Sequence, residues 1–408
     1  MFWTFQRRRF PVAAVVAVVL GLVLASHQPA RAMSTADFLA SLTGQETADL
    51  QAWKAARRAH EHHLDVYWDK VEAKRQARKK KRSRTVRFTA DDYVMTLPPS
   101  YTGPKLSNSL AAKYSKFLAS QEKAAPSRSS SLPVVSDYLG AAKRVYGFVP
   151  ERVSEKEFKR RYAEEAHALG LEKNQVVRVY ALETGGIGTY DMQAGIHPTK
   201  KTGRAISSAL GYAQLLDANS VNELSKNGKL FIAHLQRKAA NPNISSQRRH
   251  ELNYKITVLK RMYANAKRVP YNWARHQRYA KTEEGMGMHV LNIDGDIGPM
   301  LQAMKLKGLL DMGAKYGRTN MTGAQVEVMN LSGPATGLEL MQPAGLKAPV
   351  SNFFSRRAYY VNKMVIGLTG EQLLAELDRR MTASMKAQGS IEFAQAFDEV
   401  LAARTAGR

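Results

Sequence analysis

The chain has 408 residues, no cysteine and a formal net charge of +26, from 61 Lys and Arg against 35 Asp and Glu. Without cysteine it forms no disulfide and carries no cysteine-linked lipid, so its apolar core alone has to hold it together. A surface this basic attracts polyanions, although charge supplies attraction and retention rather than chemistry.

The first residues are typical of an export signal. Arg7, Arg8 and Arg9 precede an apolar run from Val12 to Ala25, and Ala30-Arg31-Ala32 fits the small-x-small rule for cleavage. The run is short of the roughly 20 residues that span a bilayer. We therefore expect a signal peptide over residues 1–32, cleaved after Ala32, and a periplasmic or secreted protein. A retained membrane anchor is the alternative.

Residues 33–90 form a basic N-terminal region. One long polar helix is expected from Thr35 to about Arg87, and it ends in a run from Lys70 to Arg87 with ten Lys or Arg and one Glu. This run is either solvated and partly disordered, or an electrostatic tether to an anionic envelope surface. His60-Glu61-His62-His63 lacks a second half, so we expect no metal and no cofactor.

Residues 91–139 are rich in Pro and Ser and indicate a linker with one short helix near residues 109–121. A compact domain is expected over residues 140–368, followed by a C-terminal helical extension over residues 369–408. Capping boxes and apolar periodicity mark several helices, and alternating strand patterns are nearly absent. The fold class is therefore mainly α. The helix starts expected here are Ser154-x-x-Glu157, Pro299, Thr322-x-x-Gln325 and Thr369-x-x-Gln372.

Glu183 is the strongest candidate for chemistry. Val176 and Tyr180 lie seven and three residues before it, which puts its carboxylate on the apolar face of a helix that Gly185 and Gly186 end. Desolvation there raises the pKa of a carboxyl group, as a general acid at neutral pH requires. The alternative is a structural acid that caps the helix or pairs with Arg178.

Four motifs occur in an order that resembles a known family. They are Glu183-Thr184-Gly185, the segment Gly211-Tyr212-Ala213-Gln214-Leu215-Leu216, Asn292-Ile293-Asp294-Gly295, and Asn330-Leu331-Ser332-Gly333-Pro334, with a late Tyr360-Val361. Together they resemble the soluble lytic transglycosylases, the peptidoglycan-cleaving relatives of goose-type lysozyme, over about Phe148 to Lys363. The third motif is not a calcium loop, because its sixth position is Ile297 and its twelfth is Ala303.

The resemblance implies a lysozyme-like helical catalytic domain that cleaves the bond between N-acetylmuramic acid and N-acetylglucosamine. Glu183 would act as the single acid and base, giving 1,6-anhydro ends. The glycan strand would be bound by the residues that match the family's groove, Gly211, Tyr212, Gln214, Asn330 and Tyr360. Core packing is an equal alternative for Tyr212. The aromatic hydroxyl that the family places beside its acid is missing, since Met329 or Asn330 stands there.

The sequence leaves other functions open. A lysozyme-type hydrolase would need a second carboxylate, and Asp191 is the near candidate. An inactive glycan-binding or wall-anchoring protein would use the same groove without cleavage. Nucleic acid is not an expected partner, because it would require the export signal to be misread.

Overall fold

The computed structural model describes residues 33–84, 86–124 and 132–406. Within these ranges the chain is helical and contains no β-strand, only isolated bridges such as Leu210 with Leu215. The expected mainly-α class is confirmed. The expected signal segment, residues 1–32, lies outside the described residues. In the part that is described, every helix is too short or too polar to cross a bilayer.

The chain divides into two compact units, one of residues 1–57 with 102–129 and the other of residues 58–101 with 130–408. The first unit contains α1 (Thr35–Ala40), the beginning of α2 (Gly44–Ser83) and α3 (Asn108–Ala124). Phe38, Leu50 and Leu110 form its small core. The helix α3 confirms the short helix predicted inside the linker.

The single helix expected from Thr35 is two helices. Thr43 and Glu46 form a reciprocal cap, in which the Thr43 hydroxyl accepts from the Glu46 N–H at 3.1 Å and the Glu46 carboxylate accepts from the Thr43 N–H at 2.9 Å. This cap starts α2 afresh after the break at residues 41–43.

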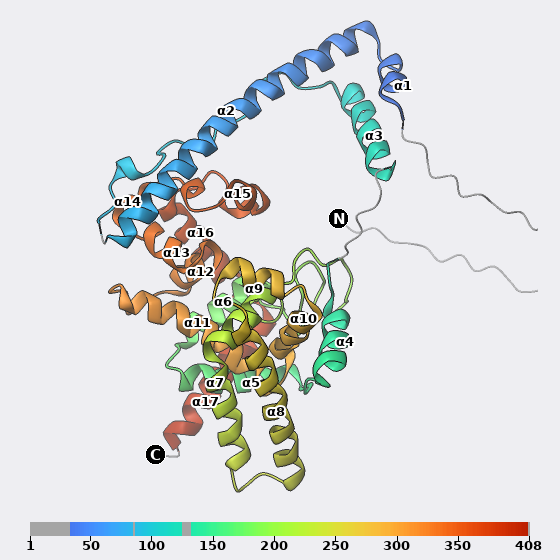
Figure 1. Cartoon of the computed structure of the whole chain (residues 1–408). Coiled ribbons are helices and arrows are strands. Elements are labelled where there is room, and N and C mark those ends of the chain that lie inside the picture. The colour runs from blue at the N-terminus through green and yellow to red at the C-terminus, as the bar shows by residue number, and fades with distance from the viewer. Residues whose placement is uncertain (1–32, 85, 125–131, 407–408) are drawn as a thin grey trace, which may run out of the picture. The chain divides into compact units, whose positions relative to one another are not determined.

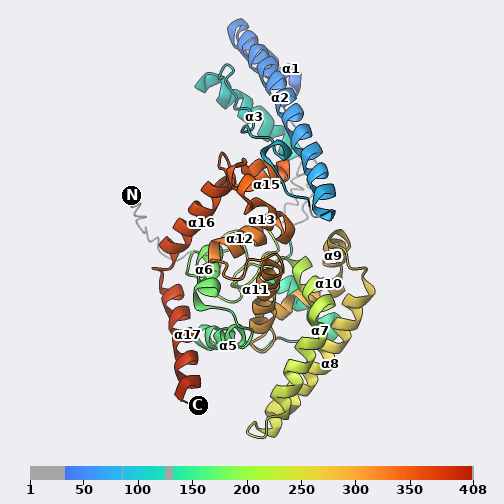
Figure 2. The ribbon, with the colours of Figure 1, turned by 90° about the vertical axis from the view of Figure 1, so that its left-hand side faces the viewer.

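The second unit holds the rest of the chain, including the later half of α2. Its α-helices are α4 (Val135–Tyr146), α5 (Glu155–Ala168), α6 (Lys173–Thr184), α7 (Asp217–Ala240), α8 (Ser246–Arg268), α9 (Trp273–Tyr279), α10 (Glu283–His289), α11 (Gly298–Lys315), α12 (Gly323–Ser332), α13 (Pro334–Leu340), α14 (Pro343–Lys347), α15 (Arg356–Val361), α16 (Gly370–Ser384) and α17 (Gln388–Ala406). Four 3₁₀ turns join them, η1 (Ala90–Asp92), η2 (Val290–Ile293), η3 (Val350–Asn352) and η4 (Lys363–Val365). Helices α7 and α8 run side by side as a long hairpin (Figure 1 and Figure 2).

The helix starts predicted from the sequence are confirmed. Ser154 caps α5 by accepting from the Glu157 N–H, and Thr322 and Thr369 form the predicted capping boxes at α12 and α16. Pro299 stands in the first turn of α11. These predictions succeed because each depends on a side chain within three residues of the backbone that it serves.

The expected domain boundaries differ from the observed units. Arg78, inside the basic run, is 1% exposed: its guanidinium donates to Glu339 Oε1 at 2.6 Å and to the backbone oxygens of Asp92 and Asn352, each at 2.8 Å. Arg82 also pairs with Glu339. The basic run is therefore neither a disordered segment nor a free tether along its whole length, because part of it is built into the second unit. Its acidic partner Glu339 lies too far along the sequence to be foreseen.

The C-terminal segment, expected as an extension, likewise packs into the core of the second unit. Phe393 and Phe397 of α17 are buried, and Phe393 lies in an aromatic cluster at the centre of the unit. Helix α17 packs on α5 and α6, as Figure 2 shows for α5. The cluster consists of Phe158, Tyr162, Tyr180, Tyr190, Tyr212 and Phe393.

Candidate functional site

Glu183 lies in the last turn of α6, where the sequence places it. Val176 and Tyr180 are each 1% exposed, so the helix buries the face that the spacing predicts. Gly185 takes a left-handed conformation with a φ of 64° and ends the helix. Glu183 itself is partly exposed, and Ile187 after it is 52% exposed. Its carboxyl group is desolvated, while the residue as a whole is half-buried beside this exposed loop.

The loop after Glu183 is fixed by local hydrogen bonds and by the C-terminal helices. The Tyr180 hydroxyl donates to the Gly188 oxygen at 2.9 Å, and the Thr184 hydroxyl donates to the Tyr180 oxygen at 2.7 Å. Gly186 has a φ of 72°, and a Cβ there would lie 2.4 Å from the backbone oxygen of Ser384. Only glycine fits this contact, so the connection between α16 and α17 holds the loop in place.

Helix α12 supplies the groups that face Glu183. Asn330 Nδ2 donates to Glu183 Oε1 at 3.2 Å and to Glu327 Oε1 at 3.4 Å. Glu327 and Asn330 are three residues apart on one helix, so they share a face. Two carboxyl groups and one amide thus meet between α6 and α12.

Glu327 is completely buried, and its carboxyl group shares a hydrogen bond with that of Glu183 and accepts another from Asn330. Burial, and then the nearby Glu183, raise the pKa of Glu327 far above its ordinary value, while Asn330 and the distant charge of Lys305 oppose the shift. Both effects favour the protonated form of Glu327, whose O–H is then the donor toward the Glu183 carboxyl group.

Burial also raises the pKa of Glu183, to about 7, although the hydrogen bonds with Glu327 and Asn330 pull it down. Two touching carboxyl groups without a cation cannot both ionise, so the pair holds at least one proton across the neutral range. Glu183 is the member that exchanges its proton near neutrality. It can act as an acid in one protonation state and as a base in the other.

Glu183 does not pair with Arg178, which is one of the two structural alternatives considered for it. Arg178 donates to the Asp378 carboxylate at 2.6 Å and to the Thr382 hydroxyl at 3.1 Å, on α16. The cation nearest in sequence is therefore engaged elsewhere, and burial is what raises the pKa of Glu183.

Asp191 is held by cations. Arg152 donates to its Oδ2 at 2.6 Å, Lys201 to its Oδ1 at 3.0 Å and the Thr189 hydroxyl to Oδ1 at 2.7 Å. Burial raises the pKa of Asp191, but these hydrogen bonds outweigh it and leave the pKa below its ordinary value. The oxygens of Asp191 are occupied by these hydrogen bonds, which argues against a role as a second catalytic carboxylate.

Gly211 and Gln214 form a tight turn beside α11. Gly211 has a φ of 80°, and a Cβ there would lie 2.7 Å from the side-chain amide of Gln302. Gln214 Nε2 donates to the backbone oxygens of Gly211 at 2.8 Å and Met192 at 3.2 Å. These donors hold the turn in its folded shape rather than reaching outward for a ligand.

Tyr212 is 1% exposed and belongs to the aromatic cluster, where its hydroxyl donates to Glu155. Its ring lies 4.7 Å from that of Tyr180, edge to face. The interpretation as a sugar-stacking ring does not fit this position, and the alternative of core packing does. The turn presents Tyr212 inward because the ring is the largest apolar group of its segment.

Tyr360 lies on α15, 40% exposed, with its ring 6.0 Å from that of Trp68 on α2. Among the described residues, no contact joins it to Glu183. Met329 occupies one of the two positions considered for the missing tyrosine and is fully buried. Of the predicted site residues, the structure therefore brings only Asn330 to Glu183.

Glu327 is the site residue that sequence reasoning missed. It stands among Ala324, Val326, Val328 and Met329, all apolar and buried. A lone acid inside an otherwise apolar turn of helix, three residues before the Asn of the fourth motif, is the signal that could have found it.

No protein-family model, no curated protein and no solved structure matches this chain. Its function is therefore inferred from the geometry of the site and from the order of the sequence motifs.

Proposed function

We propose that the protein is an exported lytic transglycosylase that cleaves peptidoglycan strands with a lysozyme-like helical domain. The observation that carries the proposal is Glu183, a half-buried residue at a helix end whose desolvated carboxyl group has a pKa raised to about 7. An acid in that state is protonated often enough to donate and ionised often enough to accept. The order of the sequence motifs supports the same reaction class.

The reaction uses one carboxyl group twice. Protonated Glu183 donates its proton to the glycosidic oxygen, and the bond from the muramyl C1 to that oxygen breaks. The Glu183 carboxylate then removes the proton from the muramyl C6 hydroxyl. The C6 oxygen bonds to C1 and closes the 1,6-anhydro ring, so no water is consumed.

Glu327 and Asn330 are positioning residues in this scheme. Both donate hydrogen bonds to the Glu183 carboxylate, so they stabilise the anion that exists between the two proton transfers. Glu327 is fully buried and does not reach a substrate. A single-carboxylate reaction is favoured over hydrolysis, because Asp191 is paired with Arg152 and Lys201.

The test is a digest of purified peptidoglycan by the wild-type protein, Glu183→Gln and Glu371→Gln, with products identified by mass spectrometry. Glu371 is an exposed acid on α16 and serves as the matched control. Anhydro-muramyl products from the wild type and the control, absent with Glu183→Gln, would establish the activity.

Two other outcomes are informative. Reducing-end products that vanish in Glu183→Gln would mean a hydrolase of lysozyme type. Glycan binding without any product from the wild type would mean a wall-anchoring protein, an alternative that the buried Met329 favours because the family's hydroxyl is missing.

A further inference from the structure

A pocket lined by three arginines lies where the C-terminal end of α8 leads into α9 and α10. It has a volume of about 530 Å³. Arg268 comes from the last turn of α8, and Arg275 and Arg278 come from α9. The full lining is Asn265, Arg268, Val269, Pro270, Arg275, Arg278, Tyr279, Thr282 and Glu284.

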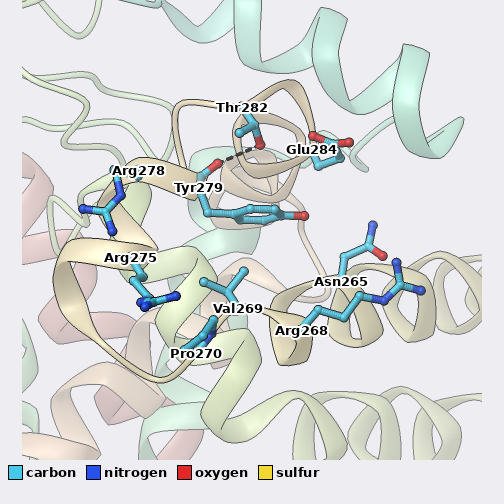
Figure 3. Close-up of a pocket in the computed structure, with 9 residues that line it drawn as sticks. All are labelled: Asn265, Arg268, Val269, Pro270, Arg275, Arg278, Tyr279, Thr282 and Glu284. Atoms are coloured by element: carbon cyan, nitrogen blue, oxygen red, sulfur yellow. Dashed lines mark hydrogen bonds between the residues drawn. The ribbon is translucent and has the colours of Figure 1, made fainter.

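The pocket has an apolar middle and charged ends. Figure 3 shows the Tyr279 ring lying across the middle of the pocket, with Val269 and Pro270 on one side of it and Thr282 and Glu284 on the other. Arg275 and Arg278 lie at one end, and Arg268 lies beside Asn265 at the other (Figure 3). A ligand with a flat or ring-shaped body and a negative charge would match this distribution.

The three guanidinium groups have no acidic partner within the described part of the chain. Among those residues, neither an ion pair nor a hydrogen bond is made by the guanidinium of Arg268, Arg275 or Arg278. The acid of the lining is Glu284, so the pocket keeps an excess of positive charge. By contrast, Arg160, Arg248 and Arg356 in the same unit all pair with carboxylates.

The sequence explains why these arginines stay unpaired. From Lys255 to Lys281 the chain has eight Lys or Arg and neither Asp nor Glu. Two aromatic side chains of the same stretch, Tyr271 before α9 and Trp273 at its start, are 64% and 42% exposed. Positive charge that the fold leaves without an acidic partner, around the Tyr279 ring of the lining, is what a site for an anionic ligand requires.

We propose that this pocket binds a phosphate ester of a sugar or other polyol. The planar guanidinium groups match the tetrahedral oxygens of a phosphate, to which arginine donates in pairs of hydrogen bonds. The carbon face of the polyol packs on the Tyr279 ring and on Val269 and Pro270. The binding does not involve Glu183 and does not depend on cleavage of glycan.

The test is calorimetric titration of the full chain with glucose 6-phosphate, inorganic phosphate and glucose. The proposal predicts that glucose 6-phosphate binds most tightly and that glucose does not bind measurably. Arg275→Gln and Arg268→Gln should each weaken binding by about tenfold, the usual effect of losing a charge-assisted hydrogen bond.

Lys267→Gln is the matched control, since Lys267 is exposed, adjacent to Arg268 and not part of the lining. An equal loss in Lys267→Gln would assign the binding to general surface charge and overturn the pocket. Binding of the wild type neither to glucose 6-phosphate nor to phosphatidylglycerol vesicles would overturn it as well.

A second experiment distinguishes a phosphate carried by a lipid from one carried by a free sugar. Vesicles of phosphatidylglycerol, compared with phosphatidylcholine vesicles, present the same polyol phosphate on a lipid. Binding to the former that Arg275→Gln weakens more than Lys267→Gln would assign the site to a lipid headgroup. Binding of glucose 6-phosphate alone would assign it to a free sugar phosphate.

Discussion

Two clusters of buried acids in the second unit differ in one respect, the presence of a cation. Glu183 and Glu327 meet between α6 and α12, where Asn330 donates to both and no cation forms an ion pair with either among the described residues. Asp294 and Asp296 lie in the turn before α11, where Lys255 Nζ is 3.0 Å from Asp294 and 2.6 Å from Asp296.

The pKa values depend on these cations as well as on depth. Burial raises the pKa of Asp296, but Lys255 and the other cations around it outweigh burial and hold the pKa well below its ordinary value. At Asp294, which is completely buried, Lys255 opposes the rise but burial still prevails. Burial also dominates at Glu183 and Glu327, and both pKa values rise. The protonation state of a buried acid therefore depends on the contacts of its oxygens as much as on its depth.

The largest expected effect comes from removing the cation of the second cluster. Lys255→Met should lower the free energy of unfolding by about 3–5 kcal/mol, because it leaves the completely buried Asp294 without its cation, whereas Asp296 keeps Arg248. Denaturant unfolding measures the loss. Lys260→Met, at an exposed position of the same helix, should change stability by less than about 0.5 kcal/mol. Similar losses in both variants would contradict the assignment.

The second effect is a pH dependence that arises from the glutamate pair. Glu183 has an ordinary pKa of 4.5 and a folded pKa of about 7. Between these values the folded protein holds a proton that the unfolded chain has released. The contribution of Glu183 to the free energy of unfolding should therefore fall by about 2–3 kcal/mol as the pH rises from about 4.5 to 7. Asp296, with a lowered pKa, loses its own contribution only at acidic pH.

Unfolding curves of the double variant Glu183→Gln with Glu327→Gln check this slope. The variant should show a flatter dependence than the wild type across the window, because neither amide titrates. Glu371→Gln should keep the wild-type slope. A double variant that retains the slope would place the responsible protons elsewhere.

The smallest effect is expected from Asn330→Ala. Asn330 donates to the Glu183 carboxylate and lowers its pKa, so the variant should raise that pKa further, by up to about one pH unit or 1.4 kcal/mol. Carbon-13 NMR titration of the glutamate carboxyl groups measures the shift. Asn243→Ala, at an exposed position, should leave the titration unchanged. A fall in the pKa of Glu183 would contradict the hydrogen bond.

Local signals in the sequence predicted the parts of the fold that depend on neighbours in the chain. The caps at Ser154, Thr322 and Thr369 each needed only the next three residues. Glu183 could be found for the same reason, since its helix and its glycines are contiguous. Mainly-α class followed from the same periodicity.

The parts that depend on distant partners could not be predicted. Arg78 is buried because Glu339 meets it, and a run of basic residues gives no sign of that pairing. Tyr212 became a core residue through contacts with rings on α5, α6 and α17. The partnership of Glu183 with Glu327 likewise depends on how α6 and α12 pack, which no local pattern encodes.

The contact of Gly186 with the α16–α17 connection has a consequence for biosynthesis. Gly389 approaches Gly186 closely, and Ser384 and Ser390 complete the contact. A ribosome makes these residues long after Glu183, and closing so long a loop costs chain entropy that only the finished core repays. Glu183 meets Glu327 and Asn330 only once α12 has been made and has packed on α6. The carboxyl pair therefore forms only after most of the chain has been made, and the loop that follows Glu183 is fixed later still, when the α16–α17 connection reaches Gly186.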